Sequence, residues 1–325
     1  METSTSKAKI CGSTSKGIDR ISGLPDDVLH NILSSLLIFD VVQLSLLSKR
    51  WKYIWTTMPY LHFDFDKFYL QRLKRLCDME MTDKFKDFIN WVLISQRATN
   101  LVRFLLIGDI YGIFDKVDIL RWIHATTRRN VQELVLEFCL LEPFELPYCV
   151  ATCESLQVLK LNLSGDILKL PNHLGFCQLK LLHLENVALS DQQLTICLFS
   201  KCHLLEKLIL QECSLGALTL LDIASTSLIY VTFGNVYYKV ESYGDCEVKL
   251  CCPNLKFFKY KQLAPMPKDI IFENLFSIED VRIVFTYSNR SLEETGILVH
   301  KMIKEVPSTS ILKLCEASYS VNYSL

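Results

Sequence analysis

The sequence lacks any run of about 18–20 consecutive apolar residues, the length that a membrane-spanning helix requires. Residues 1–18 are polar and rich in small side chains, and they contain no apolar segment of the kind that a secretory signal needs. We therefore expect a disordered tail over residues 1–18, and a globular protein of the nucleus and/or cytoplasm that is neither secreted nor bound to a membrane.

The chain also lacks a strong net charge and is poor in glycine. It has 35 basic and 36 acidic residues, so no overall field attracts it to nucleic acid or anionic lipid. Only 11 residues are glycine, and no GxSxG, HExxH, phosphate-loop or Rossmann pattern occurs. We interpret two basic clusters, RLKRL from Arg72 and TTRRN from Thr126, as helix-surface charge. The sequence predicts no catalytic residues, no cofactor and no nucleic-acid partner.

Cysteine is plentiful, but its spacing does not indicate a metal site. The 13 cysteines are odd in number, and in a reducing compartment most are expected to be free thiols that pack as small apolar residues. The close sets have spacings that differ from Cys-x2-Cys and lack a matching histidine pair. These sets are Cys149 with Cys153, Cys197 with Cys202, and Cys246 with Cys251 and Cys252.

A repeat occupies most of the chain, with apolar residues at its first, fourth and sixth positions. Successive units begin about 23 to 30 residues apart, close to the period of a leucine-rich repeat. We expect an α/β fold in which eight parallel strands stack into an irregular leucine-rich-repeat solenoid, a curved horseshoe with a continuous leucine ladder inside. The units begin at Leu101, Val131, Leu156, Leu179, Leu205, Leu228, Leu255 and Ile278.

Side chains that alternate with the buried ladder are expected to form the concave face of this sheet. Apolar members lie among charges of both signs, a mixture that suits recognition of a target protein through anchors with a polar surround. The alternative is that they are only a solvated sheet face. The candidate target-binding residues are Val135, Lys160, Leu181, His183, Ile209, Tyr230, Phe257 and Lys259.

The segment before the repeats is helical in pattern and too apolar for its size. Apolar residues recur at three- and four-residue steps from Leu24 to Leu36, and a second helix is expected to carry residues from Val41 to Trp55. A unit of about 40 residues rarely buries so many apolar side chains by itself. A partner protein is therefore expected to cover some of them.

The segments Leu24-Pro25-Asp26-Asp27, Ile32-Leu33, Asp40-Val41-Val42 and Leu47-Ser48-Lys49-Arg50-Trp51, followed by Trp55, resemble the F-box. This resemblance implies binding to a Skp-type adaptor, and through it to the cullin and RING subunits of an SCF-type ubiquitin ligase. One departure is Leu37-Ile38-Phe39, where related plant sequences carry proline and polar residues. The residues implied for the adaptor interface or its supporting core are Leu24, Pro25, Ile32, Leu33, Leu36, Val41, Leu44, Leu47 and Trp51.

The resemblance extends over about residues 19–290 and is to plant F-box/LRR proteins of the F-box/FBD/LRR type. It implies a substrate-recognition subunit without catalytic activity of its own, and a C-terminal FBD domain that is absent or truncated here. The expected organisation is a tail (1–18), an F-box (19–60), a linker and helical cap (61–100), leucine-rich repeats (101–290), and a C-terminal helix and strand (291–325). A helix through Phe85, Ile89 and Val92 is expected to cover the edge of the first repeat strand.

Several alternatives remain open from the sequence alone. A repeat scaffold that has no role in ubiquitination is favoured by the altered turn at Ile38 and Phe39. An extracellular receptor would carry N-glycans, and a hydrolase would lose activity on substitution of His183. For the favoured hypothesis, a charge placed at Leu33 or Trp51 is expected to abolish adaptor capture.

Overall fold

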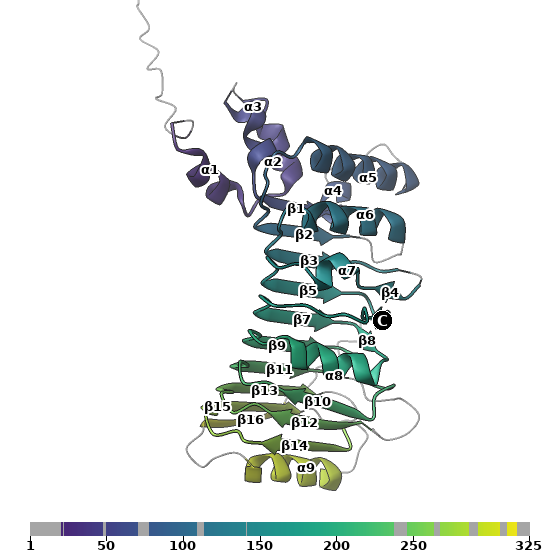
Figure 1. Cartoon of the computed structure of the whole chain (residues 1–325), viewed down its shortest axis with the longest axis vertical. Coiled ribbons are helices and arrows are strands. Elements are labelled where there is room, and N and C mark those ends of the chain that lie inside the picture. Colours follow the sequence, from purple (N-terminus) through teal and green to yellow (C-terminus); the bar gives the residue numbers. More distant parts are fainter. Residues whose placement is uncertain are drawn as a thin grey trace, which may run out of the picture.

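The computed structural model describes residues 21, 23–47, 50–70, 78–108, 114–140, 142–236, 246–262, 267–285, 292–305 and 311–316. A small unit of helices lies at one end of a long stack of strands (Figure 1). The helices of this unit are α1 (Asp26–Leu33), α2 (Ile38–Leu44) and α3 (Trp51–Ile54), followed by a 3-10 turn at Trp55–Thr57.

The stack of strands is one ten-stranded sheet in which every adjacent pair is parallel. Each unit of the chain adds the next strand to the sheet, so the registers follow the repeat. In order across the sheet the strands are β1 (Tyr60–Asp64), β2 (Arg103–Ile107), β3 (Glu133–Glu137), β5 (Val158–Asn162), β7 (Leu181–Glu185), β9 (Lys207–Gln211), β11 (Tyr230–Gly234), β13 (Phe257–Gln262), β15 (Asp280–Phe285) and β16 (Ile311–Glu316).

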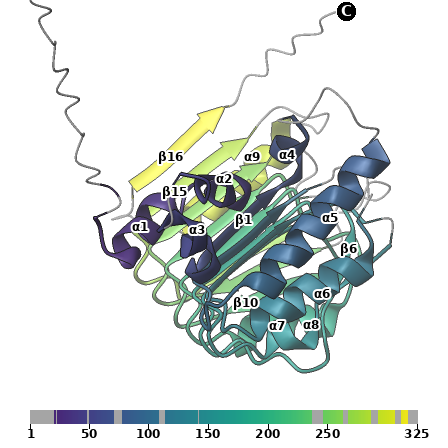
Figure 2. The same cartoon turned by 90° about the horizontal axis from the view of Figure 1, so that it is seen from above.

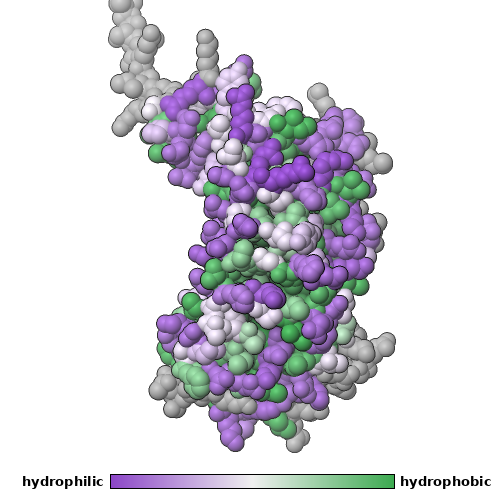
Figure 3. Space-filling view, viewed as in Figure 1, coloured by the Kyte–Doolittle hydropathy of each residue, from purple (hydrophilic) through white to green (hydrophobic). Residues whose placement is uncertain are grey.

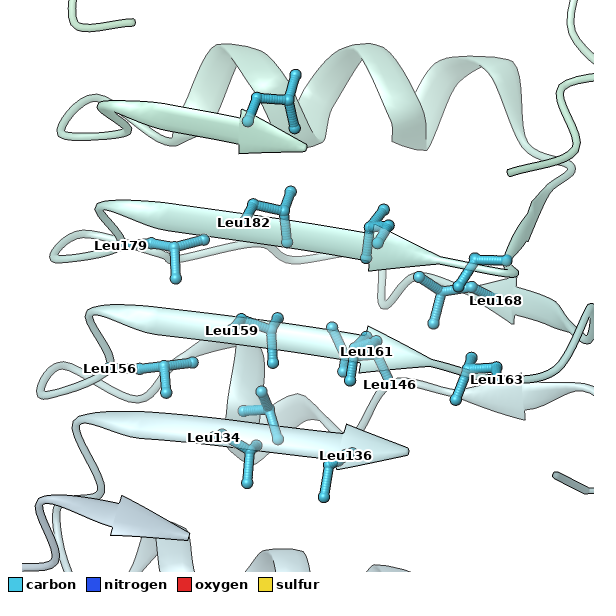
Figure 4. Close-up of a cluster of buried hydrophobic side chains, with 14 of the residues drawn as sticks. Leu134, Leu136, Leu146, Leu156, Leu159, Leu161, Leu163, Leu168, Leu179 and Leu182 are labelled. Atoms are coloured by element: carbon cyan, nitrogen blue, oxygen red, sulfur yellow. The ribbon is translucent and has the colours of Figure 1, made fainter. Parts of the chain in front are cut away.

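The first, fourth and sixth positions of the repeat form the core. In the unit that begins at Leu156, that residue, Leu159 and Leu161 are all buried, and the same holds in the units before and after it. Their side chains stack from strand to strand as a ladder (Figure 4). This arrangement confirms the predicted leucine-rich-repeat solenoid, because one unit alone has no partner surface on which to bury its leucines.

The sheet extends beyond the eight repeat strands that the sequence analysis predicted, by one strand at each end. β1 lies in the segment that was assigned to the linker, and Met58, Leu61 and Phe63 there repeat the first, fourth and sixth positions and are fully buried. At the opposite end β16 pairs with β15, in the segment expected to hold the last strand. The count of eight repeat strands therefore missed β1, because Met58, Leu61 and Phe63 stand at positions where the other units carry mainly leucine.

Return segments lie on one face of the sheet (Figure 2), and their type changes along it (Figure 1). The first units return through helices, where apolar residues recur at helical spacing. The units of β9, β11 and β13 return through extended segments with alternating burial, and the unit of β15 returns through a helix again. Among the described residues no helix has both the length and the apolarity needed to cross a membrane. The return elements are α4 (Phe65–Leu70), α5 (Asp78–Ser95), α6 (Lys116–Thr127), α7 (Tyr148–Ala151), α8 (Gln192–Lys201) and α9 (Leu292–Glu305), with β4 (Phe144–Glu145), β6 (Ile167–Lys169) and β8 (Ala188–Leu189) in one small sheet and β10 (Leu220–Ala224), β12 (Glu247–Cys251) and β14 (Asp269–Glu273) in another.

The helix expected through Phe85, Ile89 and Val92 is α5, and all three side chains are buried. Its expected place was wrong. α5 connects β1 to β2 and packs beside α6 in the helical layer, whereas it is α2 of the N-terminal unit that packs against β1. The N-terminal helices thus cover the end of the sheet themselves.

Candidate protein-interaction surfaces

The N-terminal helices are held together by contacts between the two halves of the F-box motif. The guanidinium of Arg50 donates to the carbonyl oxygen of Leu24, and it pairs with the carboxylate of Asp26 at 2.9 Å. His30 is buried beneath them, with its Nε2 3.3 Å from the carbonyl oxygen of Ile54. Residues 24–30 and 50–54, far apart in the sequence, therefore meet as one folded unit.

The residues predicted to bind an adaptor divide into three groups. Leu33, Val41 and Trp51 are buried, and Leu24 and Leu44 are partly buried against the same core. Ile32 and Leu47 are 53% and 69% exposed, and Pro25 and Leu36 are exposed as well. Pro25, Ile32, Leu36 and Leu47 are therefore the most accessible to a partner, Leu24 and Leu44 are accessible in part, and Leu33, Val41 and Trp51 belong to the core that supports them.

Further exposed apolar residues were missed by the sequence analysis. Leu46 is 87% exposed, and Ile21, Val28 and Tyr53 are exposed too. Val28 and Ile32 are four residues apart and share a face of α1 beside that of the buried Leu29 and Leu33, and Leu36 is exposed just after the helix ends. The spacing of these residues could have predicted that a helix of only eight residues is apolar on two sides. Together Pro25, Val28, Ile32, Leu36, Leu46, Leu47 and Tyr53 are named the F-box apolar surface below.

The departure from the family pattern at residues 37–39 has a structural explanation. Leu37 and Ile38 are buried, and α2 begins at Ile38. The ring of Phe39 lies edge-on to those of Phe68 and Phe88, with centroids 5.3 and 5.6 Å apart. These apolar residues attach the helical unit to the first repeat, where a polar turn would make no such contact.

Other contacts fix the same junction. The indole rings of Trp55 and Trp91 are 4.6 Å apart, and the side-chain amide of Gln96 donates to the carbonyl oxygen of Met58 at 2.8 Å. The buried apolar residues form one continuous cluster from Leu29 to Met302. The helical unit and the repeats therefore share a core, which fixes their relative orientation.

The eight predicted target-binding residues all lie on the outward face of the main sheet, the face opposite the helical layer. The register places them in two rows that run across the strands. One row contains Leu181, Tyr230 and Phe257, and the other contains Val135, Lys160, His183, Ile209 and Lys259. Val135 is buried, whereas the rest are partly or fully accessible.

Charged groups on this face are partly desolvated. Burial raises the pKa of Glu137, and burial followed by repulsion from Glu137 and Glu212 raises the pKa of Glu185. Burial, and then the charges of Lys160 and Lys207, lower the pKa of His183 from its usual value. This face therefore holds a neutral histidine among charges of both signs.

His183 has no arrangement typical of a catalytic base. Within the described part of the chain its Nε2 makes no hydrogen bond, and the nearest carboxylate oxygen, Oε2 of Glu185, is 3.5 Å away. A nucleophile would need to lie within hydrogen-bond distance of the base that activates it. The hydrolase hypothesis gains no support from this geometry.

The thiols and the basic clusters have structural roles where they are described. The cysteines whose side chains are described are free, and burial raises the pKa of Cys213 and Cys252 to about 12, so these thiols stay protonated. No group of three potential metal ligands occurs among the described residues. Arg129 donates to the carbonyl oxygens of Ala125 and Leu93 at the ends of two helices. The cluster from Arg72 lies outside the described residues.

An aromatic pair marks the far half of the outward face. The rings of Tyr230 and Phe257 are stacked at 4.6 Å with an angle of 4° between their planes, and Nζ of Lys207 is 5.9 Å from the Tyr230 centroid. A shallow cavity of about 170 Å³ lies beside the pair, and Lys259 and Arg282 contribute to its lining. The opposite side of the molecule, which carries α5, α6 and α8, shows hydrophilic residues interspersed with smaller hydrophobic areas (Figure 3).

A helical unit with an exposed apolar surface, joined to a leucine-rich-repeat solenoid, defines an F-box/LRR protein. The family model of the F-box domain matches residues 21–63, and that of the LRR repeats of the FBD-associated F-box protein At5g56370 matches residues 119–249. No FBD match accompanies them. The chain belongs to the plant F-box/FBD/LRR-repeat protein family. F-box/LRR proteins are generally non-catalytic adaptors, and F-box domains in general bind Skp-type adaptors.

Relatives from Arabidopsis thaliana are similar over different lengths. The F-box/FBD/LRR-repeat protein At5g56420 is 36% identical over 65% of this chain and 47% of its own length. The putative FBD-associated F-box protein At3g50710 is 30% identical over 92% of this chain and 66% of its own length. The F-box/LRR-repeat protein At3g26922 is 26% identical over 97% of this chain and 96% of its own length. This chain thus spans about half to two thirds of the first two, and no solved structure matches it.

Proposed function

We propose that the protein is the substrate-recognition subunit of an SCF-type ubiquitin ligase. Its F-box apolar surface binds a Skp-type adaptor, through which cullin and RING subunits assemble, and the outward face of its sheet binds the target protein. The observation that carries this proposal is the exposure of the F-box apolar surface, in which Ile32, Leu46 and Leu47 are each more than half exposed.

Covering the F-box apolar surface supplies the energy for adaptor binding. Complete burial of a leucine or isoleucine side chain contributes about 1.5–3 kcal/mol. A few such anchors account for most of the binding energy of a protein interface. Ile32 and Leu47 are the strongest candidates, because each is large, apolar and more than half exposed.

The role proposed for the repeats is to position a target. Because Trp55 packs on Trp91 and Phe39 on Phe88, a target on the sheet is held at a fixed distance and orientation from the adaptor. Ubiquitin transfer accelerates when a target lysine is kept at high effective concentration near the charged enzyme. The partner proteins perform the transfer, and this chain supplies the geometry.

The runner-up function is an interaction scaffold that binds no adaptor. It was favoured by the altered turn at residues 37–39. Ile38 and Phe39 now have a role in joining the F-box to the repeats, and the F-box apolar surface remains exposed. The altered turn therefore gives the scaffold alternative no support.

The test is co-purification of the full chain with a Skp-type adaptor. We expect the wild-type chain to retain the adaptor, and Ile32→Glu and Leu47→Glu to lose it while their circular dichroism and Tm stay unchanged. The matched control is Ile297→Glu, since Ile297 is 64% exposed and lies on α9 at the opposite end of the molecule from the F-box (Figure 1). Adaptor retention by both F-box variants at the wild-type level would refute the proposal.

Ile32→Glu and Leu47→Glu test adaptor binding in place of the substitutions that the sequence analysis suggested. Leu33 and Trp51 were to be tested by adding a charge, but both are buried in the core of the F-box. A charge at either position would unfold the F-box, because a buried unpaired charge is strongly unfavourable. Loss of adaptor capture would then say nothing about direct contact.

A further inference from the structure

Charge is unevenly distributed along the outward face of the main sheet. On β1, β2, β3, β5 and β7 the outward positions carry more acidic than basic side chains, and on β9, β11, β13, β15 and β16 the reverse holds. In the first half these are the acidic Asp64, Glu133, Glu137 and Glu185 and the basic Arg103 and Lys160; in the second half they are the basic Lys207, Lys259, Lys261, Arg282 and Lys313 and the acidic Asp280.

We infer that the second half of this face binds an acidic segment of the target protein that carries an aromatic side chain. The inference rests on the proposed function and names the class of partner that the sheet would take. The surface involved, called the basic-aromatic surface, comprises Lys207, Tyr230, Phe257, Lys259, Lys261 and Arg282.

The aromatic pair supplies the apolar part of this surface. Tyr230 remains 41% exposed although its ring is stacked on Phe257, so the pair presents one flat apolar area instead of two separate rings. The shallow cavity beside it, about 170 Å³, is large enough for part of an aromatic side chain. Aromatic rings are favoured partners for such an area because they bury a large surface with little loss of conformational entropy.

The lysines supply the electrostatic part. Arg282 pairs with Asp280 at 2.8 Å, which neutralises the one carboxylate on the outward positions of this half. Within the described residues Lys207, Lys259 and Lys261 form no ion pair, so their charges are available to a ligand. Carboxylates of an acidic segment would be attracted to them, and the acidic first half of the face would repel the same segment and set its position.

An acidic peptide fits this surface better than a nucleic acid does. Single-stranded nucleic acid binds by stacking successive bases on aromatic rings along a continuous basic groove. Here the two rings stack on each other, and the basic region stops at β9, beyond which Glu185 and Glu137 lie on the same face. A short anionic ligand is accommodated, whereas a long one would meet repulsion.

The test uses a displayed library of randomised peptides selected on the full chain. Five strands spaced about 4.8 Å apart are crossed by about six extended residues, so peptides of about ten residues suffice. We expect the selected peptides to be enriched in Asp and Glu around one aromatic residue. Their binding, measured by fluorescence anisotropy, should weaken with added salt.

Substitutions distinguish peptide binding at the basic-aromatic surface from nonspecific electrostatic attraction of the peptide to the chain. Lys259→Glu and Tyr230→Ala are each expected to weaken the best selected peptide by about tenfold or more, which corresponds to about 1.4 kcal/mol. The matched control is Lys201→Glu, an exposed lysine at the end of α8 in the helical layer, and it should leave affinity within about twofold, because distant sites act independently. Peptides without acidic enrichment, equal losses for Lys259→Glu and Lys201→Glu, or an oligonucleotide that displaces the peptide would each overturn the inference.

Adaptor capture, measured on the same preparations, distinguishes the two proposals. If the chain retains a Skp-type adaptor but selects no acidic peptides, only this inference fails. If acidic peptides bind at the basic-aromatic surface while the adaptor is not retained, the ligase function fails and the binding surface stands.

Discussion

The ring of Phe39 in the F-box packs edge-on against the ring of Phe88 in the return helix α5, with 5.6 Å between their centroids. The pair joins α2 to α5, and Phe88 also contacts Phe63 of β1. Two parts of the chain that the sequence separates into a small module and a solenoid are thereby one folded body, with the F-box apolar surface and the outward face of the sheet on the same frame.

Replacing Phe39 tests this frame. Phe39→Ala is expected to destabilise the protein by about 2 kcal/mol, somewhat less than for a fully buried phenylalanine, because the ring is partly buried. Chemical denaturation should still show a single transition, since the F-box and the repeats share a core. Two separate transitions in the wild-type chain would contradict the shared core.

The leucine ladder predicts a second stability effect. Leu208→Ala removes a fully buried side chain from β9 and is expected to cost about 2–5 kcal/mol. Leu204→Ala, four residues earlier and 42% exposed, is the matched control and should cost much less. Similar midpoints of urea unfolding for the two variants would show that the ladder is not the core.

Acid conditions are expected to weaken the fold through His183. Its pKa is lowered in the folded state by burial and by Lys160 and Lys207, so the unfolded chain binds the proton first as pH falls below about 6.5. The stability that the fold gains from a neutral His183 is fully present above about pH 6.5. It is lost as pH falls from there toward the lower pKa of the folded state. His183→Gln should therefore lose less stability than wild type between pH 7 and pH 5.5. Equal slopes of the free energy of unfolding against pH would exclude this role.

Thiol chemistry should follow burial. Burial raises the pKa of Cys213 to about 12, whereas Cys177 is exposed. Under native conditions a thiol reagent is expected to modify Cys177 quickly and Cys213 only after the chain unfolds, since the thiolate is the reactive form. Mass spectrometry of the labelled peptides gives the two rates. Modification of both cysteines at the same native rate would mean that the turn after β9 opens readily.

The repeat was predictable because its signal is local. Leucines at the first, fourth and sixth positions recur in every central unit, and each of them is buried as expected. β1 was missed although Met58, Leu61 and Phe63 follow the same spacing, since the residue types differ and these residues lie where the F-box meets the linker. The three-stranded sheet of β10, β12 and β14 was not foreseen, because a return segment that is short and alternating has no strong signature of its own.

The division of the F-box residues depended on contacts between distant segments. The sequence placed Ile32 and Leu33 together in one apolar group, but only the packing of α1 on the 3-10 turn and on β1 decides which of them is exposed. In the same way, the bond from Arg50 to the backbone of Leu24 joins residues 26 positions apart. Local periodicity determines which residues are apolar, whereas long-range packing determines which of them a partner can reach.

The most direct test of the account is the affinity of the full chain for a Skp-type adaptor, measured by isothermal titration calorimetry. Losing one hydrophobic anchor of about 2 kcal/mol, with a charge introduced in its place, should raise the Kd of Leu47→Glu by about thirtyfold or more. Ile297→Glu should bind as tightly as wild type. Equal Kd values for wild type and Leu47→Glu, or no measurable binding by the wild-type chain, would contradict the central claim.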